Sequence, residues 1–258
     1  MKIIPQTYDK DEYIRWHQDE FEVGFNIHNS LSEFQERVTS YFFEKDKKQL
    51  STLFQFINEV LRISEIRRSN IDYFILPEKP KNEIEFKQKY LKQSDSIINK
   101  FWRKNRSKHD VKTSNFHLQL KDLIRFSIKV DSLLSAETIA KVLSDKELLI
   151  RHSKDCEEYF EHEIDEIKVD NEMKMSSGYF AYHCYLYFRK NFIVEIQLFS
   201  ELSNSWRKMS HKIYDKVRLQ DAQAYKFNDV NSRMVSIGHL LYLAECELSS
   251  IEKEMEDT

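Results

Sequence analysis

Two carboxylates, Asp122 and Glu195, stand out because each adjoins or interrupts a run of apolar residues that is typical of a strand. Asp122 precedes the run LIRFSIKV, and Glu195 lies within FIVEIQLFS. Two strand carboxylates that converge on one site can hold Mg²⁺ and orient or deprotonate a hydroxyl nucleophile, as phosphoryl-type transfer requires. A solvated strand residue is the alternative for each of them alone. Asp122 and Glu195 are therefore candidate catalytic and metal-binding residues, with Mg²⁺ as the expected cofactor.

Lys92, Ser96 and Lys100 form a row at four-residue spacing. Ser94 and Asp95 are good N-cap residues before the apolar run IINKFW, so we expect a helix to start near Ser94. Ser96 and Lys100 would then share a face, and backbone N–H groups at the helix start would hold an anion that both lysines neutralise. This is the outline of a triphosphate site. A row of surface lysines without a ligand is the alternative.

The glycine in Ser177-Gly178-Tyr179 allows a turn that would bring the ring of Tyr179 to a polar face, where a purine could stack. A core tyrosine after a turn is the alternative. A hairpin turn over residues 189–191, with Phe188 paired to Phe192, decides which residues share that face. The two-residue period of a strand puts these residues on the polar face: Tyr179, His183, Tyr185, Glu195 and Gln197. The opposite, core face would carry Tyr182, Leu186, Val194, Ile196 and Leu198.

Composition narrows the function classes. The 258-residue chain has three glycines, too far apart for GxGxxG, GxxxxGK[ST] or GxSxG, which removes the sequence support for dinucleotide-binding, P-loop and hydrolase-elbow chemistry. Three separate cysteines without a CxxC pair indicate reduced thiols. No signal-peptide core and no run approaching about 18 apolar residues is present, so we expect a cytoplasmic protein without a membrane partner.

Charge is distributed unevenly along the chain. The formal charge is −3, yet residues 79–112 contain eleven Lys or Arg and four acids. Such a basic zone suits phosphates or nucleic acid, and Arg103, Lys104 and Arg106 within it are candidate contacts to RNA. A solvated basic helix without a ligand is an equally weighted alternative.

Apolar spacing predicts an α+β fold, a mixed β-sheet flanked by helices, with helical N- and C-terminal extensions. The expected helices cover residues 31–61, split near 45–48, then 94–102, 136–149 behind a Ser135 cap, 203–217 and 230–255. The expected strands cover residues 123–130, 164–169, 179–188 and 192–199. Residues 76–80 contain two prolines and indicate a linker. We therefore expect an extension at 1–76, a main domain at 77–220, and a C-terminal helix within 221–258 packed on that domain.

Five motifs in order resemble the synthetase domain of the RelA/SpoT family, especially its small single-domain alarmone synthetases. The match runs from about Lys89 to the C-terminus. YLKQSDSIINK resembles RxKxxxSxxxK through Lys92, Ser96 and Lys100, and KDLIRFSIKV resembles DxxGxR through Asp122. SGYFAYH resembles GYRxxH through Gly178, Tyr179 and His183, and VEIQLFS resembles EIQIRT through Glu195, Ile196 and Gln197. WRKMSHKIYDK resembles W....H..YK through Trp206, His211 and Tyr214.

The resemblance implies a nucleotidyltransferase-like synthetase domain over residues 77–220 and a pyrophosphokinase. Such an enzyme moves the β,γ-pyrophosphate of ATP to the 3′-hydroxyl of GDP or GTP. The implied roles are donor-phosphate binding by Lys92, Ser96 and Lys100, Mg²⁺ binding by Asp122, metal binding or hydroxyl activation by Glu195, purine stacking by Tyr179, and acceptor contact by His183 and Gln197. Positioning and charge neutralisation would supply most of the catalysis.

The chain departs from the family where phosphate-binding arginines are expected. Tyr90 replaces the arginine of RxK, Arg125 and Ser127 replace the glycine and arginine of DxxGxR, and Phe199 replaces the arginine after EIQ. Tyr90 could stack on an adenine, whereas Ser127 and Phe199 cannot bind phosphate as a guanidinium does.

These departures leave three functions open. The first is transfer to a free guanine nucleotide. Toxic members of the family pyrophosphorylate the 3′-CCA end of tRNA instead, which would bring tRNA and an antitoxin protein as partners and give the basic zone a role. The third is a non-catalytic nucleotide- or partner-binding relic. A homo-oligomer is a further candidate assembly.

Overall fold

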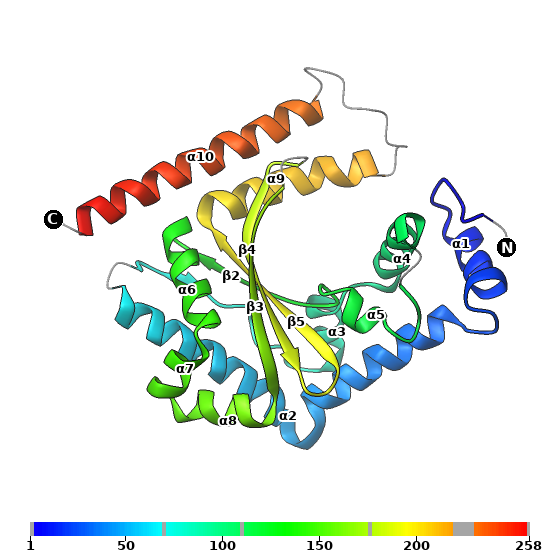
Figure 1. Ribbon diagram of the computed structural model, residues 1–258, viewed down its shortest axis with the longest axis horizontal. Helices are drawn as coiled ribbons and strands as arrows, with labels where there is room; N and C mark the ends of the chain where they lie inside the picture. The colour runs from blue at the N-terminus through cyan, green and yellow to red at the C-terminus, as the bar shows by residue number, and fades with distance from the viewer. Residues whose placement is uncertain (1–2, 69–70, 109–110, 175–176, 219–229, 257–258) are drawn as a thin grey trace.

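The computed structural model describes residues 3–68, 71–108, 111–174, 177–218 and 230–256 (Figure 1). Its centre is a five-stranded sheet in the order β1-β2-β5-β4-β3. The strands are β1 (Phe74–Ile75), β2 (Ile124–Val130), β3 (Ile164–Lys174), β4 (Tyr179–Phe188) and β5 (Phe192–Ser200). β2 and β5 are parallel, and the other pairs are antiparallel. The expected mixed sheet flanked by helices is confirmed.

The β4–β5 hairpin has the predicted register. Phe188 pairs with Phe192, Tyr185 with Glu195, and His183 with Gln197. Asn191 in the turn has a φ of 58°, a left-handed conformation that asparagine tolerates better than most residues. The predicted division into a polar and an apolar face is therefore confirmed.

The apolar face of the sheet packs against α6 (Leu133–Ser144), and α2 (Ile27–Arg67), α7 (Lys146–His152) and α8 (Lys154–His162) lie on the same side (Figure 1). The expected break near residues 45–48 is wrong, because α2 is continuous over 41 residues. Phe42 and Leu50, both fully buried, lie about two turns apart on either side of that charged stretch, so the apolar stripe stays in phase across it.

The helix after β2 begins and ends differently from the expectation. Ser132, not Ser135, is its N-cap and accepts a hydrogen bond from the Ser135 backbone N–H. The helix ends at Ser144, and Asp145 caps the separate helix α7. Aspartate favours such caps because its carboxylate bonds free N–H groups of the next first turn.

The segment between β1 and β2 forms three helices: α3 (Glu83–Tyr90), α4 (Ser94–Lys108) and α5 (Phe116–Gln119). α4 starts at Ser94, as predicted. α1 (Lys10–Trp16) lies beside α4 (Figure 1). A short π-helix, η1 (His17–Phe21), follows α1 directly. Within the described residues, no helix has both the length and the apolar character that crossing a membrane demands.

The segment expected as a linker, residues 76–80, does not separate two cores. Just before it, Phe74 and Ile75 pair with Val130 and Lys129 of β2. Phe54 of α2 packs edge-on against Phe126 of β2, with ring centroids 5.9 Å apart. The N-terminal helices and the sheet thus share one hydrophobic core.

α9 (Glu201–Arg218) and α10 (Val230–Glu256) cross the end of the sheet where Tyr179 begins β4 (Figure 1). The backbones of Gly178 and Gly238 touch there. A Cβ on Gly238 would lie 2.4 Å from the carbonyl oxygen of Gly178, and Gly178 itself has a φ of +65°. Only glycine allows this approach of α10 to the turn before β4.

We expect Gly238→Ala to lower the free energy of unfolding by about 1–3 kcal/mol, because the added methyl group must push α10 off the Gly178 turn. Urea denaturation of both proteins measures the change. The matched control is Ser236→Ala on the exposed side of the same helix, which should stay within about 0.5 kcal/mol of the parent protein. Equal unfolding curves for Gly238→Ala and Ser236→Ala would show that the two backbones do not touch in solution.

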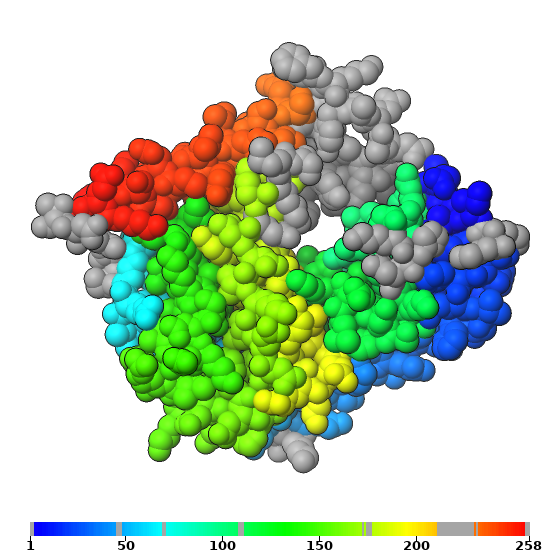
Figure 2. Space-filling view, viewed as in Figure 1, coloured from blue at the N-terminus to red at the C-terminus, as the bar shows by residue number. Residues whose placement is uncertain are grey.

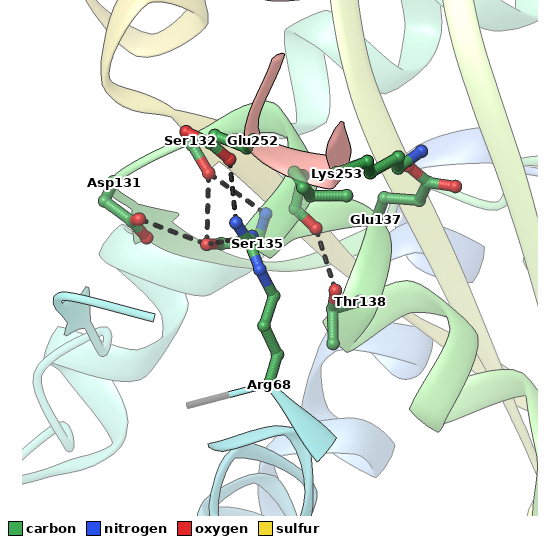
Figure 3. A network of polar contacts seen from close by, with 9 residues as sticks. Arg68, Asp131, Ser132, Ser135, Glu137, Thr138, Glu252 and Lys253 are labelled. Atoms are coloured by element: carbon green, nitrogen blue, oxygen red, sulfur yellow. Dashed lines mark hydrogen bonds and ion pairs between the residues drawn. The ribbon is translucent and has the colours of Figure 1, made fainter. Parts of the chain in front are cut away.

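Polar contacts hold the other end of α10 to α2 and α6 (Figure 3). Arg68, at the end of α2, donates to Glu252 of α10 at 2.7 Å and to the Ser135 hydroxyl at 3.2 Å. Lys253 of α10 lies 3.3 Å from Glu137 of α6. Because Arg68 is only 8% exposed, its pairing with Glu252 is less screened than a surface ion pair.

Glu245 makes the docking of α10 dependent on pH. Its side chain is buried and hydrogen-bonded to Ser200, and burial raises its pKa to about 7, with nearby Glu252 acting in the same direction. A carboxyl group whose pKa is higher in the folded state stabilises that state fully below its unfolded pKa, near 4.5, and loses this contribution as pH rises to about 7.

We therefore expect Glu245→Gln to remove this pH dependence. Between pH 5 and pH 8, the parent protein should lose up to about 3 kcal/mol of unfolding free energy relative to the variant. Chemical denaturation at pH 5, 6, 7 and 8 gives both curves. Parallel stability profiles would mean that Glu245 titrates normally.

Candidate active site

The polar face of the sheet gathers residues from three strands. β2 places Arg125 opposite Glu195 and Ser127 opposite Gln197, and β4 adds His183 and Tyr185. In the space-filling view, a hollow separates the surface of β4 and β5 from that of α4 and α5 (Figure 2). This hollow is where a ligand would reach the polar face.

Glu195 is the most enclosed charged residue of this face, with 2% of its surface exposed. Its Oε1 lies 2.5 Å from Nδ1 of His183, and its Oε2 accepts from the Gln197 amide at 3.1 Å. A carboxylate can only accept, so Nδ1 of His183 donates to it. These bonds compensate for the burial of the carboxylate and hold it in one orientation.

The hydrogen-bonded chain extends to Tyr179, whose hydroxyl lies 3.0 Å from Nε2 of His183. When Nδ1 of a neutral imidazole carries the proton, Nε2 is the acceptor, so the Tyr179 hydroxyl donates to it. The structure thus brings together Tyr179, His183, Gln197 and Glu195, all four predicted from the sequence. The ring of Tyr179 stands edge-on to Phe199, with centroids 6.1 Å apart.

Asp122 is the centre of a second cluster. Nζ of Lys92 lies 2.5 Å from its Oδ2, and Nζ of Lys100 lies 2.6 Å from its Oδ1. Burial would raise the pKa of Asp122, but the two ammonium groups hold that pKa well below its ordinary value. Burial also lowers the pKa of Lys92. The cluster is an ionised carboxylate between two cations and carries one net positive charge.

Backbone contacts position this cluster beside β2. The Lys92 N–H donates to the Leu123 carbonyl at 2.9 Å, and Leu91 forms a bridge to Ile124. Lys100 comes from α4, and Ser96 lies half-buried one turn before it. The two lysines of the predicted row are thus brought to Asp122, a convergence that spacing alone did not indicate.

Tyr90 does not fit its expected role in adenine stacking. Its ring stacks on Phe126 with centroids 4.4 Å apart, and its hydroxyl donates to the Glu78 carbonyl. Phe126 pairs with Ile196 and belongs to the apolar face, whereas Glu195 and Gln197 point to the other face of the sheet. Tyr90, at 6% exposure, is therefore a core residue on the wrong side of the sheet for a ligand in the hollow.

Arg103, Lys104 and Arg106 are exposed on the outer half of α4. The guanidinium of Arg106 lies 5.3 Å from the ring centroid of Trp102. Trp102, Arg103, Arg106 and Ser107 line a shallow pocket of about 190 Å³. The three accessible cations suit an RNA backbone, whereas the Trp102 ring itself is buried and its N–H donates to the Pro5 carbonyl.

Arg207 of α9 is a residue that the motif analysis did not single out. Its guanidinium carbon lies 4.4 Å from the centroid of the Phe199 ring. Because α9 starts directly after β5, its second turn can lie over the end of that strand. This adjacency in the sequence was the signal that could have pointed to Arg207. Trp206 is buried and donates to the Met234 carbonyl at 3.3 Å. The side chains of His211 and Tyr214 lie outside the described residues.

The polar face suits a magnesium ion that substrate phosphates help to hold. Mg²⁺ in phosphoryl-transfer sites commonly takes one or two carboxylates together with phosphate oxygens. Asp122 is ionised and partly exposed just before β2, and Glu195 is a second carboxylate on the neighbouring strand β5, opposite Arg125. Among the residues described, no cluster of three or more His, Cys, Asp or Glu side chains forms a complete metal cage. The donor set therefore fits an ion bound with its substrate better than a structural metal.

No family model and no curated protein matches the chain. Solved structures to which it is similar include small alarmone synthetase 1 from Bacillus subtilis bound to its product pppGpp, at 18% identity and a TM-score of 0.48, over 83% of this chain and 96% of that one. A GTP pyrophosphokinase family protein from Streptococcus pneumoniae is similar at 14% identity and a TM-score of 0.46, over 83% and 96%. The Type VI effector Tas1, in complex with its immunity protein, is similar at 15% identity and a TM-score of 0.35, over 75% and 97%. The chain is thus similar to solved members of the group that its motifs resemble.

Proposed function

We propose that this protein is an ATP-dependent pyrophosphokinase that transfers the β,γ-pyrophosphate of ATP to the 3′-hydroxyl of a guanine nucleotide. The convergence of Lys92 and Lys100 on Asp122 carries the proposal. Two cations around one carboxylate, all three partly exposed, provide attraction for a polyphosphate together with a ligand for its metal ion.

The Asp122 cluster and the polar face can divide the reaction between them. Lys92 and Lys100 bind the donor phosphates, and Asp122 would hold Mg²⁺, which would neutralise charge on the transferred group. Glu195 takes the proton of the 3′-hydroxyl while its contacts with His183 and Gln197 hold it in place. The 3′-oxygen forms a bond to the β-phosphorus, the bond from that phosphorus to the α-phosphate oxygen breaks, and AMP leaves with the electron pair.

Transfer to the 3′-CCA end of tRNA is the second candidate. The exposed Arg103, Lys104 and Arg106 and the shallow pocket beside Trp102 support it, because RNA binding draws on cations at a distance from the chemistry. On that alternative, an antitoxin protein would be a partner.

Incubation with γ-labelled ATP and, separately, GDP, GTP, ATP or bulk tRNA tests the proposal. We expect label on GDP or GTP and one AMP released for each product. With α-labelled ATP, the label should stay on AMP, which separates pyrophosphate transfer from nucleotidyl transfer. Label on tRNA alone would establish the second candidate. No labelled acceptor in any mixture would leave a binding protein without this activity.

A further inference from the structure

Arg207 lies at the polar face with several of its hydrogen-bond donors unused. Its Nε is buried and has no hydrogen-bond partner within the described part of the chain. One Nη donates to Oδ1 of Asn204 at a long 3.4 Å, and the guanidinium rests on the Phe199 ring. A guanidinium has five N–H groups, so most of its donor capacity remains for another molecule.

The charge of Arg207 also lacks a described counterion. Among the ion pairs of the described residues, none involves Arg207, while burial lowers its pKa. Keeping a partly buried cation unpaired costs free energy that packing on one aromatic ring compensates only in part. Such a residue is stabilised when an anion binds.

Two neighbours indicate which anion. Arg125 and Tyr179 both lie close enough to Arg207 to interact with its charge. Arg125 is exposed on β2 opposite Glu195 and has no ion pair or hydrogen bond to any side chain in the described ranges. The site therefore has two guanidinium groups beside an aromatic ring, as a nucleotide with phosphates at one end and a base at the other requires.

This anion site adjoins the donor cluster, because the charge of Arg125 acts on Lys92 as well as on Arg207. Lys92 and Lys100 already share Asp122, whereas neither Arg125 nor Arg207 forms an ion pair with an acid among the described residues. Ser127, the next residue on the same face of β2, has a small neutral side chain, and Lys129 after it is a third cation on that face, opposite Phe199. Phe199 stands where the motif that the sequence resembles has an arginine, and the guanidinium of Arg207 lies over the Phe199 ring.

We propose that Arg207, supported by Phe199 and assisted by Arg125, binds the 5′-phosphates of a free acceptor nucleotide. The inference rests on the proposed function and deepens it, because it selects the acceptor. The terminal adenosine of tRNA has only a phosphodiester at its 5′ side, so a dedicated pair of arginines favours a free nucleoside diphosphate or triphosphate over an RNA end.

Binding of GDP and of guanosine, measured by calorimetry without ATP, tests this assignment separately from turnover. We expect Arg207→Gln to weaken GDP binding on the order of 10- to 100-fold and to leave guanosine binding unchanged, since only GDP has the phosphates. Arg125→Gln, at an exposed position, should weaken GDP binding in the same direction. Lys208→Gln is the matched control, because Lys208 is the exposed neighbour of Arg207 on α9.

Thermal unfolding separates ligand binding from a structural role. Without ligand, Arg207→Gln should be at least as stable as the parent protein, because it removes an unpaired charge; a clear loss of stability would instead make Arg207 structural. GDP binding that is equal in the parent and Arg207→Gln, or absent from both, overturns the inference. So does an equal loss of affinity for a non-hydrolysable ATP analogue, which would move Arg207 to the donor site. If GDP affinity depends on Arg207 but no acceptor is labelled, the phosphate site stands and the transfer reaction fails.

Discussion

Replacing Asp122 with Asn should lower the rate of pyrophosphate transfer by on the order of 10² or more. The substitution keeps the shape of the side chain and removes the charge that the metal ion and both lysines would use. Lys92 and Lys100 then face each other without the carboxylate that now lies 2.5 and 2.6 Å from them. Rates of AMP release at saturating ATP and acceptor measure the effect.

The same substitution has a cost in stability that the bare motif does not reveal. Because the pKa of Asp122 is held below its ordinary value in the folded protein, its ionised form stabilises the fold above the unfolded pKa. We expect a loss of about 1–3 kcal/mol for these partly exposed pairs. Asp122→Asn combined with Lys92→Met should recover part of that stability while transfer stays low.

Asp170→Asn is the matched control for Asp122→Asn. Asp170 lies on β3 opposite His183, half of its side chain is exposed, and Lys121 is 3.7 Å away. Transfer by the Asp170 variant should stay near the parent rate, since neither lysine of the donor cluster contacts this residue. Normal turnover by purified Asp122→Asn would remove Asp122 from the catalytic assignment.

Replacing Glu195 with Gln should have a comparable effect, again on the order of 10² or more in rate. The amide oxygen can still accept from His183, and Gln197 can rotate its own amide to accept from the new NH₂ group, so the local packing should survive. What disappears is a carboxylate able to take a proton or bind Mg²⁺. The loss should therefore appear in kcat more than in the affinity for an ATP analogue.

Glu245→Gln serves as the control for Glu195→Gln, because it also replaces a buried glutamate but lies on α10, away from the polar face. It should transfer pyrophosphate normally at pH 7. Equal rates for the parent and Glu195→Gln would show that the carboxylate is structural. A fall in both rate and ATP-analogue affinity would instead place Glu195 at the donor phosphates.

Local pattern was sufficient for the β4–β5 hairpin and for which of its residues share the polar face, but not for β1 or for the order of the strands. Alternation over residues 179–188 and 192–199, with a three-residue turn between them, leaves one register that keeps apolar side chains together. The sequence alone therefore places Glu195 and His183 on neighbouring strands and on one face, as the register confirms. The start of α4 at Ser94 agrees with the local prediction, although Ser94 is its first helical residue and the preceding Gln93 carbonyl accepts from Ile97.

Contacts between distant segments were not determined by local pattern. Spacing placed Lys92 and Lys100 in a row but did not indicate that both would bind Asp122, and it left Tyr90 free for a ligand although its ring packs on Phe126. Motif comparison marked Phe199 as a lost arginine, whereas the fold places the guanidinium of Arg207 on its ring. Periodicity within one element determines which side of that element is buried, because it reflects local backbone geometry. Which charged side chains meet, and which remain unpaired, depends on how α4, β2, β5 and α9 pack together, and only the tertiary structure decides that.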